Sequence, residues 1–534
     1  MVFSSLTFLY IFLLFAIVSY SFTHNNRSRN NLLLGLSLFF YAWGEPIWVF
    51  LMIIDAFVVW LCSIQINKIQ KKVINNLPLH DALQEDNIKS AGQSKLSYDS
   101  HYKIQARIYL IIAIVFCLAL LLIFKYTNFF VEILNVIPFI NIPSPNIRLP
   151  IGISFFTFQI VTYIVDVYRR DAKVQNRFAD LLLYVSIFPQ LIAGPIVRYS
   201  DVAEQINRRL VTSEKLVAGI ERFLIGLGKK TLIANYAGTI VRDTISSRLS
   251  QLTTIEALLG LIAYAMQIYF DFSAYSDMAI GLGRMFGFEF LENFDYPYIS
   301  KSVTEFWRRW HMSLGTFFKD YVYIPLGGKY KHQLRNIFIV WLLTGFWHGA
   351  AVNFILWGLY YALLLVFEKY FFLKFSKNWP SFIKVSLTFI AVCFGWIFFY
   401  FIDFNKMAEY FRVLLTGANG FSSALALATV KSHLGFIIIA IIASTPLPKY
   451  AYKSLMRYLW GKFGNVFDPI KHDRSNKIQR KYVYDIEIDR SSSSHINMEK
   501  CVLVLTLIQN TLLLLLSTAS LISASYNPFL YFRF

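Results

Sequence analysis

Apolar runs separated by short polar segments dominate this chain and restrict what it can fold into. Runs of about twenty apolar residues, the length at which a helix crosses a bilayer, recur along the whole sequence. Only 16% of the 534 residues are charged, whereas soluble domains carry about 25%. The 51 phenylalanines and 32 tyrosines exclude a disordered chain, because they bring far more apolar area than ordering requires. The pattern predicts an all-α polytopic membrane protein, with residues 1–534 as one integral membrane domain.

The formal net charge of +19 does not indicate a nucleic-acid-binding protein, and we expect no nucleic acid among the partners. The basic residues stand in short clusters between apolar runs, as loop charges that orient a membrane protein do. The cysteines are scattered singly, with no paired spacing and no histidine at ligand spacing, so we expect neither a disulfide framework nor a metal site. They are Cys62, Cys117, Cys393 and Cys501.

The basic residues between the runs predict the topology. The first apolar run has no basic residue before it and no small-residue cleavage pattern after it, so we expect a retained span and not a cleaved signal peptide. Arg27 and Arg29 follow this run and place its end in the cytoplasm. Counting onward puts the polar loop 67–104 and the basic polar loop 449–500 in the cytoplasm, with both termini outside. At about 20 residues per crossing, roughly ten to thirteen spans are expected.

Ionisable residues occur inside the least polar half of the chain. Asp271 and Tyr275 share one helical face of the stretch 254–286, because they are four residues apart. A carboxylate within the membrane is costly, and a position along a substrate tunnel would explain it. A structural carboxylate that is hydrogen-bonded to a tyrosine or arginine of another helix would explain it too.

The segment 292–328 is too polar to cross lipid, although it is rich in aromatic residues. It contains Arg308, Arg309, His311 and Asp320. Such backbone is tolerated at membrane depth only where it is buried in protein or lines a wet cavity, which predicts a re-entrant segment that shapes a site. An interfacial helix with an aromatic belt and snorkelling arginines is the alternative.

A third feature is a histidine inside the apolar run TGFWHGAAVNFILWG. His348 is flanked by Gly345, Gly349 and Ala350, which let helices or a substrate approach closely. The unperturbed pKa of imidazole, about 6.5, suits removal of a hydroxyl proton at neutral pH, so His348 is a candidate general base. A core histidine with a purely structural role is the competing interpretation.

Other common catalytic motifs are absent from the sequence. It contains no complete Walker loop, no dinucleotide-binding glycine pattern and no G-x-S-x-G string. It also shows no internal repeat, which disfavours a transporter that is built from duplicated halves. A polysaccharide or lipid-linked-sugar transporter and a glycan polymerase or ligase nevertheless stay open as alternatives to an enzyme of group transfer.

Eight strings spread over nearly the whole chain carry a family resemblance. They are MVFSSLTFL, FYAWGEP, LPIGISFFTFQIVTYIVDVYR, FPQLIAGPIVRY, QIYFDFSAYSDMAIGLGRMFG, FWRRWHMSLGTFFKDYVYIPLGG, GFWHGA and YNPFLYFRF. Together they resemble the membrane-bound O-acyltransferase (MBOAT) family. Within it they are similar to the bacterial alginate O-acetyltransferases and peptidoglycan O-acetyltransferases, and more distantly to the D-alanyltransferases of teichoic acids.

The resemblance implies a multi-helix bundle with re-entrant segments and a central funnel. It maps the family's invariant histidine onto His348 and its second histidine onto His311. His348 would then deprotonate an acceptor hydroxyl, while His311 or Arg309 orients the donor or stabilises the developing oxyanion. Asp320 could fix a histidine tautomer. Acetyl-CoA or another acyl thioester would be the donor substrate, with no bound cofactor.

The resemblance also implies partners and a location. The acyl group would come from the cytoplasm and pass to a cell-surface polysaccharide or peptidoglycan, which suits a multi-pass protein of the bacterial cytoplasmic membrane. Because the apolar chain has no sizeable outer domain, we expect a separate periplasmic SGNH-type protein that collects the acyl group. Which polymer receives it cannot be read from these strings.

Overall fold

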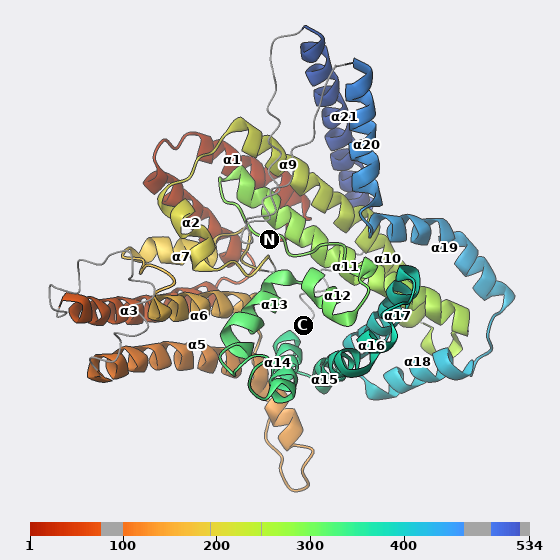
Figure 1. Ribbon diagram of the computed structural model, residues 1–534, viewed down its shortest axis with the longest axis horizontal. Helices are drawn as coiled ribbons and strands as arrows, with labels where there is room; N and C mark the ends of the chain where they lie inside the picture. Colours follow the sequence, from red (N-terminus) through yellow and green to blue (C-terminus); the bar gives the residue numbers. More distant parts are fainter. Residues whose placement is uncertain (76–99, 193, 247, 464–492, 524–534) are drawn as a thin grey trace.

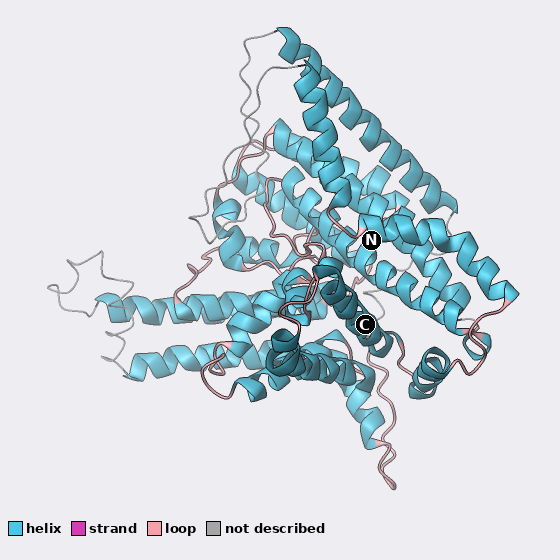
Figure 2. Cartoon of the chain, turned by 45° about the vertical axis from the view of Figure 1, so that its right-hand side comes forward, coloured by secondary structure: helices cyan, strands magenta, loops and turns pink. Residues whose placement is uncertain are grey.

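Helices and their connecting loops make up the structure. The computed structural model describes residues 1–75, 100–192, 194–246, 248–463 and 493–523 (Figure 1). Over these residues no β-strand occurs (Figure 2), which confirms the predicted all-α class.

The N-terminal half of the chain forms a series of helices that ends in one long irregular helix. Between Ser213 and Ser246 the helical backbone is continuous and passes twice through π-helical turns. The helices of this half are η1 (Phe8–Phe12), α1 (Leu13–Ser21), α2 (Asn26–Ala42), α3 (Trp48–Asn75), α5 (Ser100–Leu134), α6 (Ile153–Arg169), α7 (Phe178–Ser186), α8 (Tyr199–Asn207), α9 (Ser213–Gly228), η5 (Lys229–Ala234), α10 (Asn235–Val241) and η6 (Arg242–Ser246).

The C-terminal half begins with the central helix and alternates long helices with short ones. Its helices are η7 (Leu249–Gln251), α11 (Thr254–Met285), η8 (Pro297–Ile299), α12 (Val303–Arg309), α13 (Met312–Phe318), η9 (Lys319–Tyr323), α14 (Gln333–His348), α15 (Val352–Phe367), η10 (Glu368–Phe372), α16 (Leu373–Phe375), α17 (Ser381–Tyr400), α18 (Phe404–Thr416), α19 (Ala424–Ala443), α20 (Leu447–Phe463) and α21 (Ser493–Ser523).

Seven of the described helical segments are long and apolar enough to cross a membrane. They lie in α3, α5, α11, α15–α16, α17, α19 and α21. A shorter apolar helical stretch, Phe8–Ser21, precedes them. The chain is therefore a multi-pass membrane protein, as the apolar runs predicted.

The two polar segments 67–104 and 449–500 begin and end in helix. α3 continues through the start of the first segment to Asn75, and α5 begins at Ser100. α20 runs through the start of the second segment to Phe463, and α21 begins at Ser493. Residues 76–99 and 464–492 lie outside the described residues.

Helix α11 is the central element of the molecule and is buried along nearly its whole length. Its start is defined by a capping box, in which the Thr253 side chain accepts from the Glu256 backbone while the Glu256 carboxylate accepts from the Thr253 backbone. Its C-terminal half contributes Tyr275 and Met278 to an apolar cluster with α1–α3 and α5–α9. Its N-terminal half contributes Tyr264 to a second cluster with α10, α12, α14, α15 and α17–α19.

Glycines bring α9 against α11. A Cβ atom added at Gly226 would lie 2.7 Å from the carbonyl oxygen of Ala274, and one at Gly219 would lie 2.7 Å from that of Gly281. Because the obstructing atoms are backbone, no side-chain movement could make room. The two helices therefore pack at the short separation that small residues allow, as in membrane helix pairs.

Helices α14 and α15 form an antiparallel hairpin. Gly345 and Gly358 face each other at its crossing, where an added Cβ atom would come within 2.2 to 2.3 Å of backbone carbonyl oxygens of Phe354 and Trp341. At the open end the Lys369 ammonium donates to the Gln333 side chain, so both ends of the hairpin lie at the same side of the molecule. The closed end, at residues 349–351, carries His348. The apolar stretch 336–372 of the sequence is thus two helices with a sharp turn.

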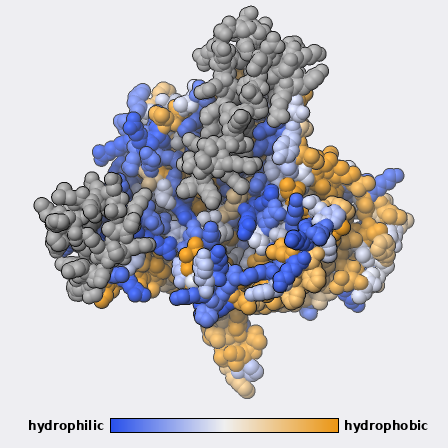
Figure 3. Space-filling model, viewed as in Figure 1, coloured by the Kyte–Doolittle hydropathy of each residue, from blue (hydrophilic) through white to orange (hydrophobic). Residues whose placement is uncertain are grey.

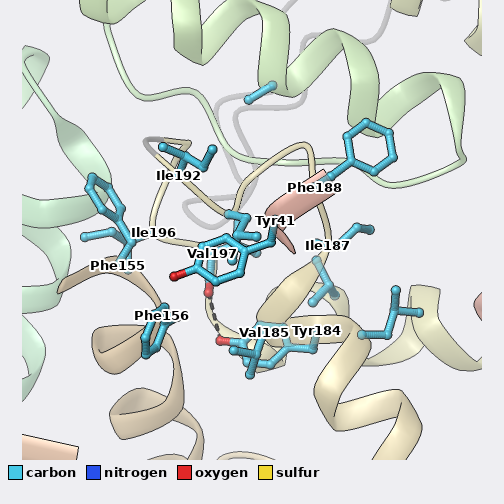
Figure 4. Packing of buried hydrophobic residues seen from close by; sticks show 14 of the residues in the cluster. Tyr41, Phe155, Phe156, Tyr184, Val185, Ile187, Phe188, Ile192, Ile196 and Val197 are labelled. Atoms are coloured by element: carbon cyan, nitrogen blue, oxygen red, sulfur yellow. Dashed lines mark hydrogen bonds between the residues drawn. The ribbon is translucent and has the colours of Figure 1, made fainter. Parts of the chain in front are cut away.

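A buried loop connects α7 to the short helix α13. After α7 the residues 187–192 and 194–198 are buried or nearly so, and the Tyr184 hydroxyl donates to the Val197 carbonyl at 2.9 Å (Figure 4). The Ile196 amide donates to the Ser313 hydroxyl at 3.0 Å, which ties this loop to α13. Its irregular backbone, which contains Pro189 and Pro195, is packed inside protein, as backbone without regular hydrogen bonds must be at membrane depth.

A loop between α5 and α6 projects from the bundle. Asn135 pins its base through two hydrogen bonds with the backbone of Ile142, at 2.8 and 2.9 Å. Val136 and Phe139 are largely exposed, and the projection shows as an apolar knob at the lower edge of the space-filling view (Figure 3).

Candidate active site

His348 is the last residue of α14 and lies at the closed end of the hairpin. It is buried, and its ring makes edge contacts with Trp347, Trp357 and Phe399 at centroid distances of 4.8, 4.9 and 5.2 Å. An added Cβ atom at Gly349 would lie 2.2 Å from the Phe354 ring, so the small residue beside the histidine is required for this turn. Aromatic walls exclude water from the imidazole and favour its neutral form.

His311 lies at the junction of α12 and α13. It precedes Met312 as the N-cap of α13 and has φ 44°, a left-handed conformation that non-glycine residues rarely adopt. Its ring is buried and packs edge-on against Phe272 of α11 at 4.6 Å. The short helices on either side explain this geometry, because the chain must reverse between them within a few residues.

Asn293 fixes the orientation of the His311 ring. Its Oδ1 lies 3.3 Å from His311 Nδ1 and also accepts hydrogen bonds from the Ser313 amide, at 3.1 Å, and the Ser313 hydroxyl, at 2.9 Å. An acceptor at this point favours the tautomer with the proton on Nδ1. Nε2 is then left with a free lone pair, and no hydrogen-bond partner of this atom occurs among the described residues.

Trp347 joins the two histidines. Its ring lies 5.9 Å from the His311 ring and 4.8 Å from the His348 ring. Phe155 and Phe158 of α6 close the other side of the indole, at 5.5 and 5.7 Å. The structure therefore brings His311 and His348, which are 37 residues apart in the sequence, into contact with the same indole.

Lys125 of α5 reaches the same place. Its side chain is buried, and its ammonium donates to the carbonyl oxygen of Trp347 and, at 3.1 Å, to the hydroxyl of Ser154. The sequence patterns did not single out this residue. A lysine inside an apolar run was the available signal, since an intramembrane charge is costly and usually has a function. Asn293 offered no signal of this kind, because its role depends on a contact that only the fold creates.

Asp271 and Tyr275 lie one turn apart on α11, as predicted, and both are buried. Asp271 forms an ion pair with Lys230 of η5 at 2.6 Å. The ring of Tyr275 stacks on Phe3 at 4.6 Å. Their neighbour Phe272 contacts His311, so this part of α11 forms the wall behind the second histidine.

The three charged residues predicted beside His311 lie farther out. Arg308 is exposed. Arg309 forms ion pairs with Glu305 at 2.8 Å and with Asp295 at 3.7 Å. These contacts place both arginines on the polar rim of the short helices, and neither points at a histidine through any contact that the described residues show.

Asp320 pairs with Arg198 at 2.5 Å. Burial lowers the pKa of the Arg198 guanidinium, but the hydrogen bond with Asp320 and the nearby Tyr321 and Asp166 together raise it above its usual value. The suggestion that Asp320 fixes a histidine tautomer is therefore wrong for His311, where Asn293 occupies that position.

Two imidazoles and one primary amine thus lie around a single indole, that of Trp347. A neutral imidazole can accept a proton from a hydroxyl, and an amine can donate hydrogen bonds to a carbonyl oxygen on which negative charge develops. The surrounding aromatic side chains keep water away, which strengthens both interactions. A proton acceptor and a hydrogen-bond donor placed in this way could serve an acyl transfer between two bound substrates.

Comparisons with known proteins agree with this chemistry. The family described as membrane-bound O-acyltransferase matches residues 154–408, which include both histidines. A probable alginate O-acetylase AlgI of Pseudomonas putida is 34% identical over the full length of both chains. A probable alginate O-acetylase AlgI of Pseudomonas aeruginosa is 39% identical over 75% of this chain and 72% of its own. A peptidoglycan O-acetyltransferase of Helicobacter pylori is 35% identical over 59% of this chain and 66% of its own.

The full-length match to an alginate O-acetylase extends over the α14–α15 hairpin and the short helices that hold the second histidine. The chain belongs to the membrane-bound O-acyltransferase family, on the branch of the bacterial alginate and peptidoglycan O-acetyltransferases.

Proposed function

We propose that this protein transfers an acetyl group from a cytoplasmic thioester, such as acetyl-CoA, toward hydroxyl groups of a cell-surface polysaccharide. The observation that carries the proposal is the position of His348 at the closed end of the hairpin, in an aromatic cluster that it shares with His311. The relatives named for O-acetylation of alginate and peptidoglycan support the acyl group and the class of acceptor.

In the proposed reaction His348 acts as the general base. It takes the proton of the acceptor hydroxyl while the hydroxyl oxygen adds to the thioester carbonyl carbon. The tetrahedral intermediate then collapses, the carbon–sulfur bond breaks, and the imidazolium returns the proton to the departing thiolate. His311, with a free lone pair on Nε2, accepts a hydrogen bond from the acceptor or donor and holds it in line.

The remaining predicted residues have supporting parts in this proposal. Asp271 and Tyr275 belong to the wall of the path along α11, and the Asp271–Lys230 pair keeps that wall neutral. Arg308, Arg309 and Asp320 lie on the polar rim of the short helices, where the donor would enter. The two arginines suit the recognition of a polar, anionic carrier of the acetyl group, and Asp320 holds Arg198 at the same rim.

The membrane topology that we propose has ten crossings. Six of the apolar helices, α3, α5, α11, α17, α19 and α21, cross once each. The helical stretches of η1–α1, α2, α6 and α9–α10 supply four more crossings. The α14–α15 hairpin enters and returns on the cytoplasmic side. Its 16-residue arms reach about 24 Å into the protein, so His348 lies near the middle of a hydrocarbon core of about 30 Å.

Contacts between the outer loops support this sidedness. The charge count places Glu45 and Arg148 outside, and the two side chains lie 3.3 Å apart. The proposed crossings place Ser250 and Asn419 outside as well, and the Asn419 amide donates to the Ser250 carbonyl at 3.0 Å. Each pair joins loops that are about 100 residues or more apart in the sequence, so shared sidedness is not a consequence of chain proximity.

Contacts between the inner loops agree with it. The Asn26 amide donates to the carbonyl of Asn207 at 3.0 Å, and the Arg169 guanidinium donates to the carbonyl of Asp320 at 3.3 Å. Asn26 and Arg169 belong to segments that the basic clusters assign to the cytoplasm, so their partners Asn207 and Asp320 lie on that side as well. In this orientation both termini lie outside, and the segments 67–104 and 449–500 lie inside. The donor would reach His348 through a funnel from the cytoplasmic side of the bacterial inner membrane.

The decisive experiment uses membrane vesicles that contain the protein and acetyl-CoA labelled in the acetyl group. Ester-linked acetate on isolated polymer or on a carrier protein should depend on the donor and should disappear in the His348→Ala variant at equal amounts of inserted protein. Movement of a polysaccharide or lipid-linked sugar without any donor requirement would contradict acyl transfer. Deletion of the gene, followed by measurement of ester-linked acetate on each surface polymer, would identify the acceptor.

A separate periplasmic protein of the SGNH type should complete the pathway. The outer loops that the structure describes, such as 135–152 and 401–423, are too short to hold a polymer. Purified protein in proteoliposomes should therefore acetylate polymer slowly until the periplasmic protein is added. Full-rate acetylation of polymer by the purified protein alone would refute this part of the proposal.

A further inference from the structure

Lys125 has an environment that its structural contacts do not explain. It lies nine residues before the end of α5, within a helix that is long and apolar enough to cross the membrane. The side chain is buried beside Tyr126 and Trp347, whose rings lie 6.0 and 5.9 Å from its nitrogen. Among the described residues no carboxylate forms an ion pair with it. This distinguishes it from Lys230, the other buried lysine, which pairs with Asp271.

A buried cation without a counter-charge is energetically expensive. Two hydrogen bonds offset part of the cost, those to the Trp347 carbonyl and the Ser154 hydroxyl. An ammonium has three donors, and no third acceptor occurs in the part of the chain that the structure describes. The third proton is therefore available to a bound molecule.

The α14–α15 hairpin determines where the third proton of the Lys125 ammonium lies. Lys125 binds the carbonyl of the residue before His348, so its nitrogen lies at the closed end of the hairpin, beside the backbone of the candidate base. A substrate that reaches His348 with its hydroxyl must bring the acyl carbonyl into the same space. Negative charge then develops on the carbonyl oxygen, next to the only unneutralised cation that the described residues place there.

We infer that Lys125 is a catalytic residue that donates a hydrogen bond to the carbonyl oxygen of the acyl group and stabilises the oxyanion of the tetrahedral intermediate. The inference rests on the proposed acyl transfer. As the acceptor oxygen bonds to the carbonyl carbon, the carbonyl π electrons move onto oxygen and are held by the ammonium. They return when the carbon–sulfur bond breaks, the thiolate leaves with the proton from His348, and Lys125 keeps its own protons throughout.

A purely structural role would also use these contacts, because Lys125 links α5 to the end of α14. The chain offers a matched control for that role in the next residue. The Tyr126 hydroxyl donates to the Phe346 carbonyl at 2.7 Å, and the two rings stack at 4.0 Å. Tyr126 thus links α5 to the neighbouring residue of α14, and its side chain carries no charge.

The test compares Lys125→Met, Lys125→Arg and Tyr126→Phe in proteoliposomes, with kcat and KM measured for the thioester and normalised to inserted protein. Methionine retains the length of the side chain but has no donor, so kcat should fall about 10²- to 10³-fold with little change in KM, as for loss of an oxyanion donor. The Arg variant keeps the charge but displaces the donor, and a shift of about 1 Å should cost kcat at least tenfold. Tyr126→Phe should retain kcat within about threefold.

Three results would overturn the inference. The first is a Met variant with kcat within about threefold of wild type. The second is an equal loss of kcat in Tyr126→Phe, which would show that the link between α5 and α14 is what matters. The third is a wild-type kcat in the Arg variant, which decides the question if the Met variant does not accumulate. A wild-type protein that transfers no acyl group under any condition would instead remove the proposed function itself.

Discussion

At the scale of the residue, the site contains a histidine whose backbone conformation is energetically unfavourable. His311 adopts a left-handed backbone conformation, which costs about 1 kcal/mol or more for a residue with a Cβ atom. The conformation persists because Asn293 and Ser313 hold the residue from one side while Phe272 and Trp347 pack against it from the other. Strain of this kind is tolerated where it orients a functional group.

Replacing His348 with alanine should remove the general base. We expect the rate of acetyl transfer to fall about 10²- to 10⁴-fold, the usual contribution of such a group, while the protein still inserts and accumulates. The measurement is acetyl transfer per unit of membrane-inserted protein. Loss of the protein would favour a structural histidine, and wild-type activity at normal abundance would end the proposed mechanism.

Replacing Asn293 with alanine should disorient His311. The Ser313 amide and hydroxyl would lose their shared acceptor, which costs about 1–3 kcal/mol of stability for buried donors, and the rate per folded protein should fall at least about tenfold. Asn336→Ala is the control, because Asn336 is equally buried and donates to three backbone carbonyls away from the histidines. It should lower the melting temperature without changing the rate per folded protein; equal rates in the two variants would count against the role of Asn293.

At the scale of the element, the close packing of α14 on α15 at two glycines determines the position of His348. The backbones touch at Gly345 and Gly358, so the turn at residues 349–351 has little freedom. Aromatic side chains of α17 and α6 then seal the closed end, through Phe399 and Phe155. The histidine is held by packing from three sides rather than by a loop.

Gly345→Ala should disturb this hairpin. The new methyl group would lie 2.2 Å from the Phe354 carbonyl oxygen, so the helices must separate, at a cost of about 1–3 kcal/mol. We expect a lower melting temperature and reduced acetyl transfer. Gly435→Ala in α19 is the matched control, because no atom lies within 4 Å of its added Cβ atom, and alanine favours helix. Equal stability of the two variants would contradict the close packing that we describe.

Sequence patterns predicted these elements unevenly. The apolar runs and the aromatic, polar segment 292–328 gave the helical class and the environment of His311, because membrane burial leaves a strong compositional signal. The hairpin was not predicted, since an apolar stretch such as 336–372 has the same composition whether it crosses the membrane or returns. The role of Lys125 was not predicted, because the carbonyl group that binds it comes from a residue 222 positions away.

The candidate site shows the same division. His311 and His348 could be proposed from the sequence, because a titratable imidazole within an apolar or aromatic-rich segment is unusual without any structural information. Their proximity depends on the contacts of Trp347, and the partners of Arg309, Asp320 and Asp271 depend on which helices meet. Side-chain roles that are defined by a partner far away in the sequence cannot be read from spacing alone.

At the scale of the whole molecule, the topology can be tested directly. In a background without native cysteines, a cysteine at Ser144 should react with a membrane-impermeant maleimide in spheroplasts, because the loop between α5 and α6 should lie outside. A cysteine at Tyr330, which is 85% exposed, should react only after permeabilisation. Labelling of the Tyr330 position in intact spheroplasts would show that the orientation is the reverse of the proposed one, with the donor side of the site facing away from the cytoplasm.

The shared burial of α11 has a consequence for how the chain comes apart. One apolar cluster needs the C-terminal half of this helix and the other needs its N-terminal half, so neither cluster is complete when the chain is cut before or after it. Heat or detergent should therefore melt the protein in one cooperative transition, because loss of either cluster exposes the helix that the other requires. Gene fragments that encode the two halves should each be degraded when expressed alone and should recover only when expressed together.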